Sequence, residues 1–241
     1  MTMSLSGKKV LVVGGGSGIG FAVAEGAARE GAVVTVASTN EQRVRAAADR
    51  IGAEAGVLDV TDEASVARFL DGKSFDHIAT TAGDWGGPRR GPLADADLAA
   101  AAAVFSVRFW GALALAKHGV KTLPPGGSIT LTNGMIAHRP AKGSVVSTAM
   151  AGGIEFMTRA LAVELAPVRV NCVCPGLIRT GVWDSIPEES REAELAKRTA
   201  RQLVPRIGEA AETAEAYLYL MRGGYTTGQV LYVDGGLALG G

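Results

Sequence analysis

A glycine-rich run, VGGGSGIG at residues 13–20, directly follows the apolar run VLVV and precedes an alanine-rich stretch. Glycines at the end of a strand allow a tight turn and let backbone N–H groups approach a phosphate at the positive end of the next helix. A flexible strand-to-helix connection is the alternative interpretation. The apolar run before it and the alanine-rich stretch after it favour a phosphate-binding loop, although the spacing is G-x-x-x-G-x-G and not G-x-G-x-x-G. The expected contacts are Gly14, Gly16, Ser17, Gly18, Ile19 and Gly20.

Small polar residues follow the second apolar run, AVVTVA at residues 32–37: Ser38, Thr39 and Asn40, with Arg43 one helical turn further on. In a dinucleotide-binding fold, an acidic residue here binds the ribose hydroxyls of NAD, whereas small hydroxyls and a basic group admit the 2′-phosphate of NADP. Because no carboxylate follows this run, we expect NADP(H) to be preferred over NAD(H). The alternative is that these polar residues only cap a helix.

Three later segments extend the pattern: Asp59-Val60 after the third apolar run, TTAG at residues 80–83, and CPGLIRT at residues 174–180. Together with the glycine loop and the terminal GQVLYVDGG at residues 228–236, this order of motifs resembles the short-chain dehydrogenase/reductase family over nearly the whole chain. The resemblance implies further cofactor contacts at Asp59, Val60, Thr81, Ala82, Gly83, Pro175, Gly176, Ile178 and Thr180.

The catalytic residues of that family are missing. Its members carry a Tyr-x-x-x-Lys pair at the start of the helix after the fifth strand, a Ser at the end of that strand, and an Asn in the preceding helix. With the register taken from the Ala-Gly pair that follows the lysine slot, Val146 and Met150 replace the tyrosine and the lysine. In the same register, Asn133 takes the serine slot and Arg108 the asparagine slot.

Loss of a positioned proton donor typically slows catalysis by about 10²- to 10⁴-fold, so ordinary ketone reduction should be slow or absent. Each remaining polar candidate has a plain alternative. Asn133 either bonds a substrate oxygen or ends a strand, and Arg108 either stabilises an oxyanion as a fixed charge or lies at the surface. His138 and Lys142 either donate protons or are solvated charges of the loop HRPAKGS.

Two classes of function therefore stay open. The first is an NADP-dependent oxidoreductase with a non-standard active site, which reduces an already polarised C=C or imine and takes its proton from water, substrate, His138 or Lys142. The second is a non-catalytic NADP(H)-binding sensor or partner subunit in which the fold persists without the chemistry.

The elements that must position these residues follow from apolar periodicity. Short runs that are continuously apolar, as expected of strands buried on both faces, alternate with helical patterns along the whole chain. Asn40 and Thr61 are placed as helix N-caps. We predict an α/β protein of one Rossmann-type domain over residues 1–241, with a doubly wound parallel sheet of seven strands and a substrate lid at about 180–203.

Composition narrows the function classes further. The chain has 241 residues, 47% of them hydrophobic, which suits one well-filled core. Lys plus Arg equals Asp plus Glu at 24 each and no basic run occurs, so nucleic acid is not an expected partner. Neither a signal peptide nor a membrane span is expected, which predicts a cytoplasmic protein acting on a small molecule.

The two cysteines, Cys172 and Cys174, lie two residues apart in an expected strand. That geometry disfavours a disulfide, and no further cysteine or clustered histidine completes a zinc site, so small core residues are the favoured interpretation and no metal is expected. The family resemblance also implies a homo-oligomer, a tetramer or dimer, formed through the helix at residues 144–165 and the last strand.

Overall fold

The computed structural model describes residues 4–83 and 91–240. Its main feature is a seven-stranded parallel sheet with the order β3-β2-β1-β4-β5-β6-β9, which confirms the predicted α/β fold. The strands are β1 Lys9–Val13, β2 Val33–Ser38, β3 Glu54–Val57, β4 His77–Thr80, β5 Ser128–Thr132, β6 Arg169–Pro175 and β9 Val230–Val233. A separate pair, β7 Ile178–Arg179 and β8 Gly208–Glu209, was not expected from the sequence.

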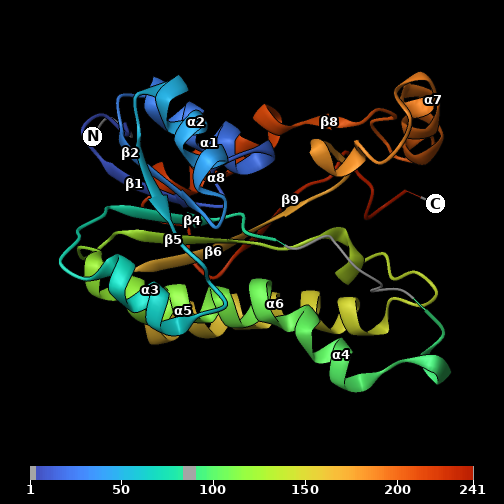
Figure 1. Cartoon of the computed structure of the whole chain (residues 1–241), viewed down its shortest axis with the longest axis horizontal. Helices are drawn as coiled ribbons and strands as arrows, with labels where there is room; N and C mark the ends of the chain where they lie inside the picture. The colour runs from blue at the N-terminus through green and yellow to red at the C-terminus, as the bar shows by residue number, and fades with distance from the viewer. Residues whose placement is uncertain (1–3, 84–90, 241) are drawn as a thin grey trace.

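Helices cover both faces of the sheet: α1, α2 and α8 lie on one face, and α3, α5 and α6 lie on the other (Figure 1). The α-helices are α1 Gly18–Arg29, α2 Glu41–Ile51, α3 Glu63–Leu70, α4 Leu98–Ala102, α5 Ala112–Gly119, α6 Val145–Glu164, α7 Glu188–Thr199 and α8 Ala210–Arg222. Shorter helical segments are η1 Leu93–Asp95, η2 Ala103–Phe105, the π-helical η3 Ser106–Gly111, η4 Val120–Thr122, η5 Met135–Ala137 and η6 Gly181–Trp183.

The strand order reverses between β1 and β4, because the chain builds β1, β2 and β3 outward in one direction and then returns to start β4 on the other side of β1. In open parallel sheets, ligands bind outside the carboxyl ends of the strands at such a switch point. The fold therefore brings the glycine loop after β1 and the TTAG turn after β4 to the same place.

The helix caps agree with expectation at one position and differ at the other. Asn40 is the N-cap of α2, where its Oδ1 accepts a hydrogen bond from the Arg43 backbone N–H at 2.8 Å. The cap of α3 is Asp62 and not Thr61. Thr61 instead bonds Asp59 Oδ1 through its hydroxyl at 2.7 Å, which closes the turn between β3 and α3.

One continuous helical stretch, Leu98–Thr122, is long and apolar enough to cross a membrane by length and composition, which differs from the expectation that none would be. Gly111, Arg108 and Lys117 interrupt its apolar character, which is why the sequence predicts no membrane span here. In the structure the stretch is a chain of short helices, and 22% of its most apolar window is buried.

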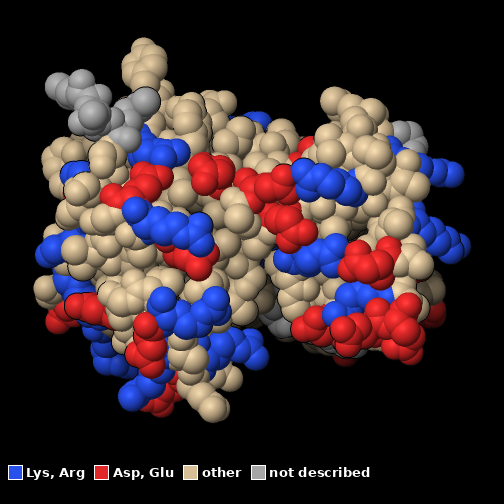
Figure 2. All heavy atoms as spheres, turned by 90° about the horizontal axis from the view of Figure 1, so that it is seen from above, with Lys and Arg blue, Asp and Glu red and all other residues tan. Residues whose placement is uncertain are grey.

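Charges of both signs are interspersed over the face of the molecule shown in Figure 2, without one continuous patch of either sign. This distribution matches the equal numbers of acidic and basic residues in the sequence.

His77, in the buried strand β4, makes stability depend on pH. Its Nδ1 lies 2.9 Å from the Ser128 hydroxyl. Burial, with smaller contributions from the charges of Arg169 and Lys8, lowers the pKa of His77 from 6.5 to about 4, although nearby Asp76 acts in the opposite direction. Between these two values, the unfolded chain binds a proton that the folded chain does not.

The free energy of unfolding should therefore fall by about 3 kcal/mol through this residue as the pH is lowered from 6.5 to below 4. We expect His77→Gln to flatten this part of the stability profile, measured by urea unfolding at a series of pH values. His118→Gln, at the partly buried histidine of α5 that contacts Glu63 at 3.0 Å, serves as control. An unchanged profile in His77→Gln would show that other groups set the acid sensitivity.

Candidate functional site

A cleft with a volume of about 1290 Å³ opens at the carboxyl ends of the strands. All residues expected to contact a cofactor line it, although the sequence places them in five separate segments. These residues are Gly14, Gly16, Ser17, Gly18, Ile19, Gly20, Ser38, Thr39, Asn40, Arg43, Asp59, Val60, Thr81, Ala82, Gly83, Pro175, Gly176, Ile178 and Thr180. The structure thus joins them on one surface, and their binding role stays a prediction.

The turn between β1 and α1 requires glycine at two positions. Gly14 has φ 85°, in the left-handed region. A Cβ added to Gly20 would lie 2.2 Å from the Gly14 carbonyl oxygen and 2.3 Å from Thr81 Oγ1. The first turn of α1 therefore packs directly against the ends of β1 and β4, which leaves the backbone N–H groups of the loop facing the cleft.

The amino end of α1 suits a phosphate. Its N-cap, Ser17, makes no side-chain capping bond, and the first turn carries no acidic residue. The helix has 12 residues, long enough to present a positive end. These features suit the pyrophosphate of a dinucleotide, because the N–H groups of the first helical turn and the helix dipole both favour an anion there.

Next to this loop, Ser38 and Arg43 face Gly16. A Cβ on Gly16 would lie 3.4 Å from Arg43 Cγ and 3.6 Å from Ser38 Oγ, so the two side chains border one small polar corner. Arg43 is exposed, and no carboxylate lies within ion-pair distance of it among the described residues. Its charge is therefore available to an anionic group bound in that corner.

Arg108 is one of the residues that line the cleft, although it is only 9% exposed. The π-helical segment η3 carries it, and such segments widen a helix and redirect its side chains. Its Nη1 donates to the Asn133 carbonyl oxygen at 3.2 Å. A Cβ on Gly83 would lie 2.6 Å from Arg108 Nη2, so the guanidinium passes over the backbone of the TTAG turn.

The wall of the cleft formed by α6 differs from the expectation by one residue. Ser147, Met150 and Ala151 line the cleft, whereas Val146 does not. Residues four apart share one helix face, so the pair that faces the cleft with Tyr-x-x-x-Lys spacing is Ser147 and Ala151. The expected register, with Val146 as the paired position, is corrected accordingly.

The same shift applies at the end of β5, where Gly134 lines the cleft and Asn133 does not. The Asn133 side chain is fully buried, and its Nδ2 donates to Glu155 Oε1 at 3.0 Å. The expectation that Asn133 contacts a substrate is therefore wrong. The residue reaches the cleft only indirectly, through the backbone carbonyl that Arg108 binds.

The two loop candidates for proton donation also lie away from the cleft. His138 contacts Glu155 Oε1 through Nε2 at 2.5 Å, and Lys142 is exposed to solvent. Neither is among the residues that line the cleft, which corrects the suggestion that they reach a bound substrate.

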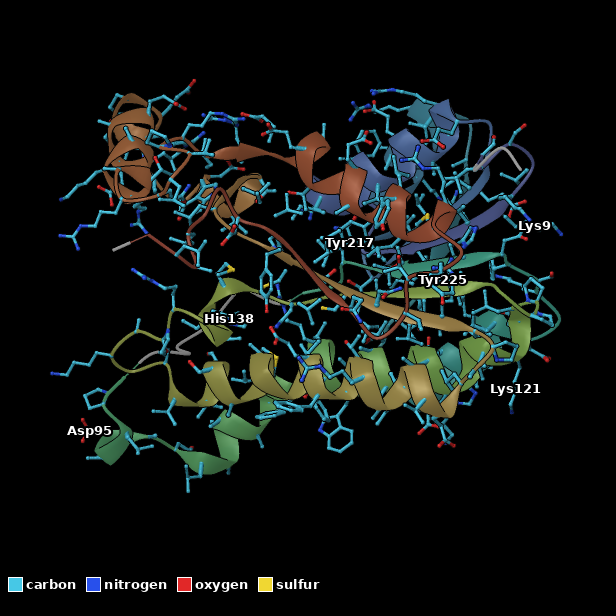
Figure 3. The ribbon with its side chains drawn as sticks, turned by 180° about the vertical axis from the view of Figure 1, so that it is seen from behind. Lys9, Asp95, Lys121, His138, Tyr217 and Tyr225 are labelled. Atoms are coloured by element: carbon cyan, nitrogen blue, oxygen red, sulfur yellow. The ribbon has the colours of Figure 1, made fainter. Side chains whose placement is uncertain are left out.

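Tyr217 lies in α8 and is fully buried (Figure 3). Its hydroxyl lies 2.6 Å from Thr132 Oγ1, which in turn donates to the Thr80 carbonyl oxygen at 2.5 Å. Burial raises the pKa of Tyr217, which makes the phenol a poorer acid. This tyrosine holds β5 to α8 and does not replace the missing proton donor.

Several residues on the substrate side were not singled out from the sequence. Apolar and charged side chains from η5, the following loop, η6 and α7 line this part of the cleft: Met135, Ile136, Arg139, Val182, Trp183, Asp184 and Arg198. The lid segment expected at about 180–203 contributes the last four. No local motif marks them, because they come together only when α7 folds back beside the C-terminal segment.

Among the described residues that line the cleft, there is neither a tyrosine nor a lysine. The cleft can therefore hold a phosphate-bearing ligand, and Arg108 brings a guanidinium to its lining, but the wall formed by α6 offers only a serine hydroxyl, a thioether and a methyl group. A strong general acid is absent from that described lining.

The fold and the glycine turn define a Rossmann-type nucleotide-binding protein. A family profile described as Enoyl-(Acyl carrier protein) reductase matches residues 14–238. The short-chain dehydrogenase/reductase malC of Malbranchea aurantiaca is 34% identical over 98% of this chain and 96% of its own length. The chain therefore belongs to the short-chain dehydrogenase/reductase family of oxidoreductases.

Solved structures agree with this assignment. The MalC Reductase/Diels-Alderase from Malbranchea aurantiaca has a TM-score of 0.88 and 32% identity, covering 98% of this chain and 97% of its own. A small-chain dehydrogenase in complex with NADPH has a TM-score of 0.82 and 34% identity, covering 98% of this chain and 100% of its own. A third structure is an NADPH-bound short-chain oxidoreductase of Pseudomonas aeruginosa PAO1, which is described as containing an atypical catalytic center. Its TM-score is 0.87 and its sequence identity is 27%, with 99% of each chain covered.

Proposed function

We propose that this protein is an NADPH-dependent reductase that transfers hydride to an already polarised C=C bond without a protein proton donor. The observation that carries the proposal is the contrast within one cleft. The phosphate-binding turn, the polar corner at Arg43 and the proline-glycine turn are all present, whereas Ser147 and Ala151 occupy the helix face where the family has tyrosine and lysine.

The cofactor preference rests on the corner formed by Gly16, Ser38 and Arg43. A 2′-phosphate there accepts hydrogen bonds from the serine hydroxyl and the guanidinium, and no nearby carboxylate repels it. The bound NADPH supplies the hydride. Two structural relatives described as NADPH complexes support this choice of cofactor.

Arg108 determines which substrates suit the cleft. Its guanidinium is held by the Asn133 carbonyl and by packing over Gly83, so it is a fixed positive charge in the cleft lining. A fixed cation stabilises negative charge that develops on a carbonyl oxygen. A carbonyl-conjugated C=C fits best, because water can protonate the product after charge has moved to the oxygen.

The relatives are consistent with chemistry beyond simple ketone reduction. MalC is described as both a reductase and a Diels-Alderase, and the Pseudomonas protein as having an atypical catalytic center. The alternative of a non-catalytic NADP(H)-binding protein uses the same cleft and is separated from the reductase by measured turnover.

The segment at about 180–203 is proposed as the substrate lid of a single-domain protein. Its helix α7 is tied to the small second sheet, because Arg179 in β7 bonds Glu192 at 2.5 and 3.0 Å and Glu209 at 3.1 Å. Trp183 Nε1 donates to the Ile178 carbonyl oxygen at 2.7 Å, which fixes the indole at the cleft rim. These anchors give the lid a defined resting position.

Self-association is proposed through the outer face of α6. Val145, Phe156 and Val163 are all exposed on this face, Phe156 by 69% and Val163 by 82%. Trp110, on the adjacent segment η3, is 58% exposed. Exposed apolar side chains gathered on one helix face are typical of an interface, and the same face in a second copy would cover them by two-fold symmetry.

The cofactor assignment predicts that Arg43→Ala weakens NADP(H) binding by about 10- to 100-fold, because a charge-assisted hydrogen bond is lost, and leaves NAD(H) binding unchanged. Isothermal titration with both dinucleotides measures this. Arg45→Ala, an exposed arginine of the same helix paired with Glu41, is the matched control. Equal losses for both dinucleotides, or tighter binding of NAD(H) by the parent, would contradict the preference.

The reaction is tested by following NADPH oxidation with paired substrates, each a conjugated enone and its saturated ketone. We expect turnover of the enone, with the ketone slower by about 100-fold or more because its alkoxide needs a positioned acid. Tight NADPH binding without turnover of either member of any pair would favour the non-catalytic alternative.

The register is tested by restoring the family residues at the positions that face the cleft: Gly134→Ser, Ser147→Tyr and Ala151→Lys. Gly134 has φ −163°, an extended conformation that serine adopts without strain. This triple variant should gain ketone reduction by about 100-fold over the parent, because the tyrosine and lysine act as a unit.

The matched control for this variant carries the same three residue types one position earlier: Asn133→Ser, Val146→Tyr and Met150→Lys. It should show no gain, since two of its three changes do not face the cleft. Circular dichroism and NADPH binding check that both variants fold. A gain in the control alone would restore the register first expected from the sequence.

The interface predicts that Phe156→Asp weakens self-association by about 10-fold or more, because a charge is placed in an apolar contact. Sedimentation over a range of concentrations measures the change. Tyr225→Asp, at a fully exposed aromatic residue in the loop after α8 (Figure 3), is the control. A parent protein that stays at 24.7 kDa at every concentration would rule the interface out.

A further inference from the structure

Behind the cleft, three side chains with metal-binding groups meet from different elements. His138 follows η5, Glu155 lies in α6 and Cys174 lies in β6. One ligand atom from each, an imidazole nitrogen, a carboxylate oxygen and a thiol sulfur, lies within 4.8 Å of the other two. None of the three residues lines the cleft, so the cluster is separate from the site described above.

Glu155 is the least ordinary member, because it is a carboxylate only 7% exposed in the middle of a helix. A buried carboxylate requires compensation by a cation or by hydrogen bonds. Its Oε1 contacts His138 Nε2 at 2.5 Å and accepts from Asn133 Nδ2 at 3.0 Å. Among the described residues, no lysine or arginine forms an ion pair with it, which leaves room for another cation.

The neighbouring asparagine provides an independent indication of a ligand. Asn133 is fully buried, and its Oδ1 has no hydrogen-bond partner among the described residues. An unpartnered buried acceptor costs about 1–3 kcal/mol. A half-turn of the amide exchanges Oδ1 with the Nδ2 that now faces Glu155, and this directs a carbonyl oxygen into the cluster.

Cys174 supplies the soft ligand. Its sulfur lies 3.6 Å from the Met135 sulfur, and the residue is fully buried. A bound divalent metal favours the thiolate, so binding at this position releases a proton.

His138 makes the cluster accessible to a metal ion from solvent, because it lies on the loop beside α6 with its side chain 30% exposed (Figure 3). The ring of Tyr232 packs edge-on against it at 4.9 Å, and the Tyr232 hydroxyl lies 3.1 Å from Nε2. The Glu155 and Tyr232 contacts both fall on Nε2, so a metal ion bound by this nitrogen would displace the Tyr232 hydroxyl from it.

We propose that His138, Glu155 and Cys174 bind a zinc-type divalent cation, with the Asn133 side-chain oxygen or water as the fourth ligand. One nitrogen, one sulfur and one or two oxygens form a donor set that zinc accepts in tetrahedral geometry. Ligand atoms of such a site lie about 3 to 4 Å apart, so small side-chain movements from the present positions close it around the metal.

The site is structural and not catalytic. It joins β6, α6 and the loop after β5, and that loop carries Met135, Ile136 and Arg139 to the substrate side of the cleft. A metal here would hold the loop in place without touching the substrate. The sequence predicts no metal because neither a further cysteine nor clustered histidines accompany Cys174; His138 and Glu155 lie 36 and 19 positions before it in the chain.

The test uses the full chain without an affinity tag, treated with chelator and then titrated with Zn²⁺ by calorimetry and with Co²⁺ by absorbance. One equivalent of each should bind, and the Co²⁺ form should show a thiolate charge-transfer band with visible bands of tetrahedral intensity. Zn²⁺ should also raise the melting temperature, since it binds only the folded state.

Cys174→Ser should abolish the charge-transfer band, while Cys172→Ser, at the other buried cysteine, should keep it. Because a buried substitution can impair folding, His138→Gln at the partly exposed ligand provides a second variant, which should weaken Zn²⁺ binding by about 10-fold or more. The proposal is overturned if the parent binds no equivalent of metal, or if folded Cys174→Ser and His138→Gln bind it as the parent does.

Discussion

The close approach of helix α1 to the ends of β1 and β4 is the constraint on which the cleft depends. The first turn of the helix lies against the Gly14 carbonyl and the Thr81 hydroxyl with no room for a Cβ at Gly20. Thr81 is held there because its backbone N–H donates to the Val13 carbonyl oxygen at 2.8 Å. This packing fixes the distance between the helix and the sheet. It therefore also fixes the position of a bound phosphate relative to the other residues that line the cleft, Arg108 among them.

The opposite side of the cleft is formed by residues that satisfy packing. Met150 belongs to the apolar cluster beneath α6, and the buried Arg108 donates a hydrogen bond to the Asn133 carbonyl oxygen after β5. Arg108 lies in the π-helical segment η3, and its guanidinium passes close to Gly83, where a side chain would not fit. The described lining of this corner thus contains a guanidinium but neither a tyrosine nor a lysine.

Sequence patterns predicted the sheet, its strand count and the surface shared by the expected cofactor residues, because loops at the carboxyl ends of adjacent parallel strands must meet. They failed at positions where one residue matters. A shift by one rotates a helical residue by about 100°, and the run Ala151, Gly152 and Gly153 offers two equivalent small pairs from which to count. The cluster of His138, Glu155 and Cys174 is not visible in the sequence, since its members are brought together only by the packing of α6 on β6.

The sheet divides the interior into two apolar clusters. One packs α1, α2 and α8 against Val10 and Val12, and the other packs α3, α5 and α6 against Leu11 and Ile129. Substitutions that share no partners add independently in their effects on stability. Mutations can therefore accumulate on the α6 side while the nucleotide-binding side keeps its energy and shape. This partition makes the fold evolvable, because substitutions can remove one catalytic activity while ligand binding is retained.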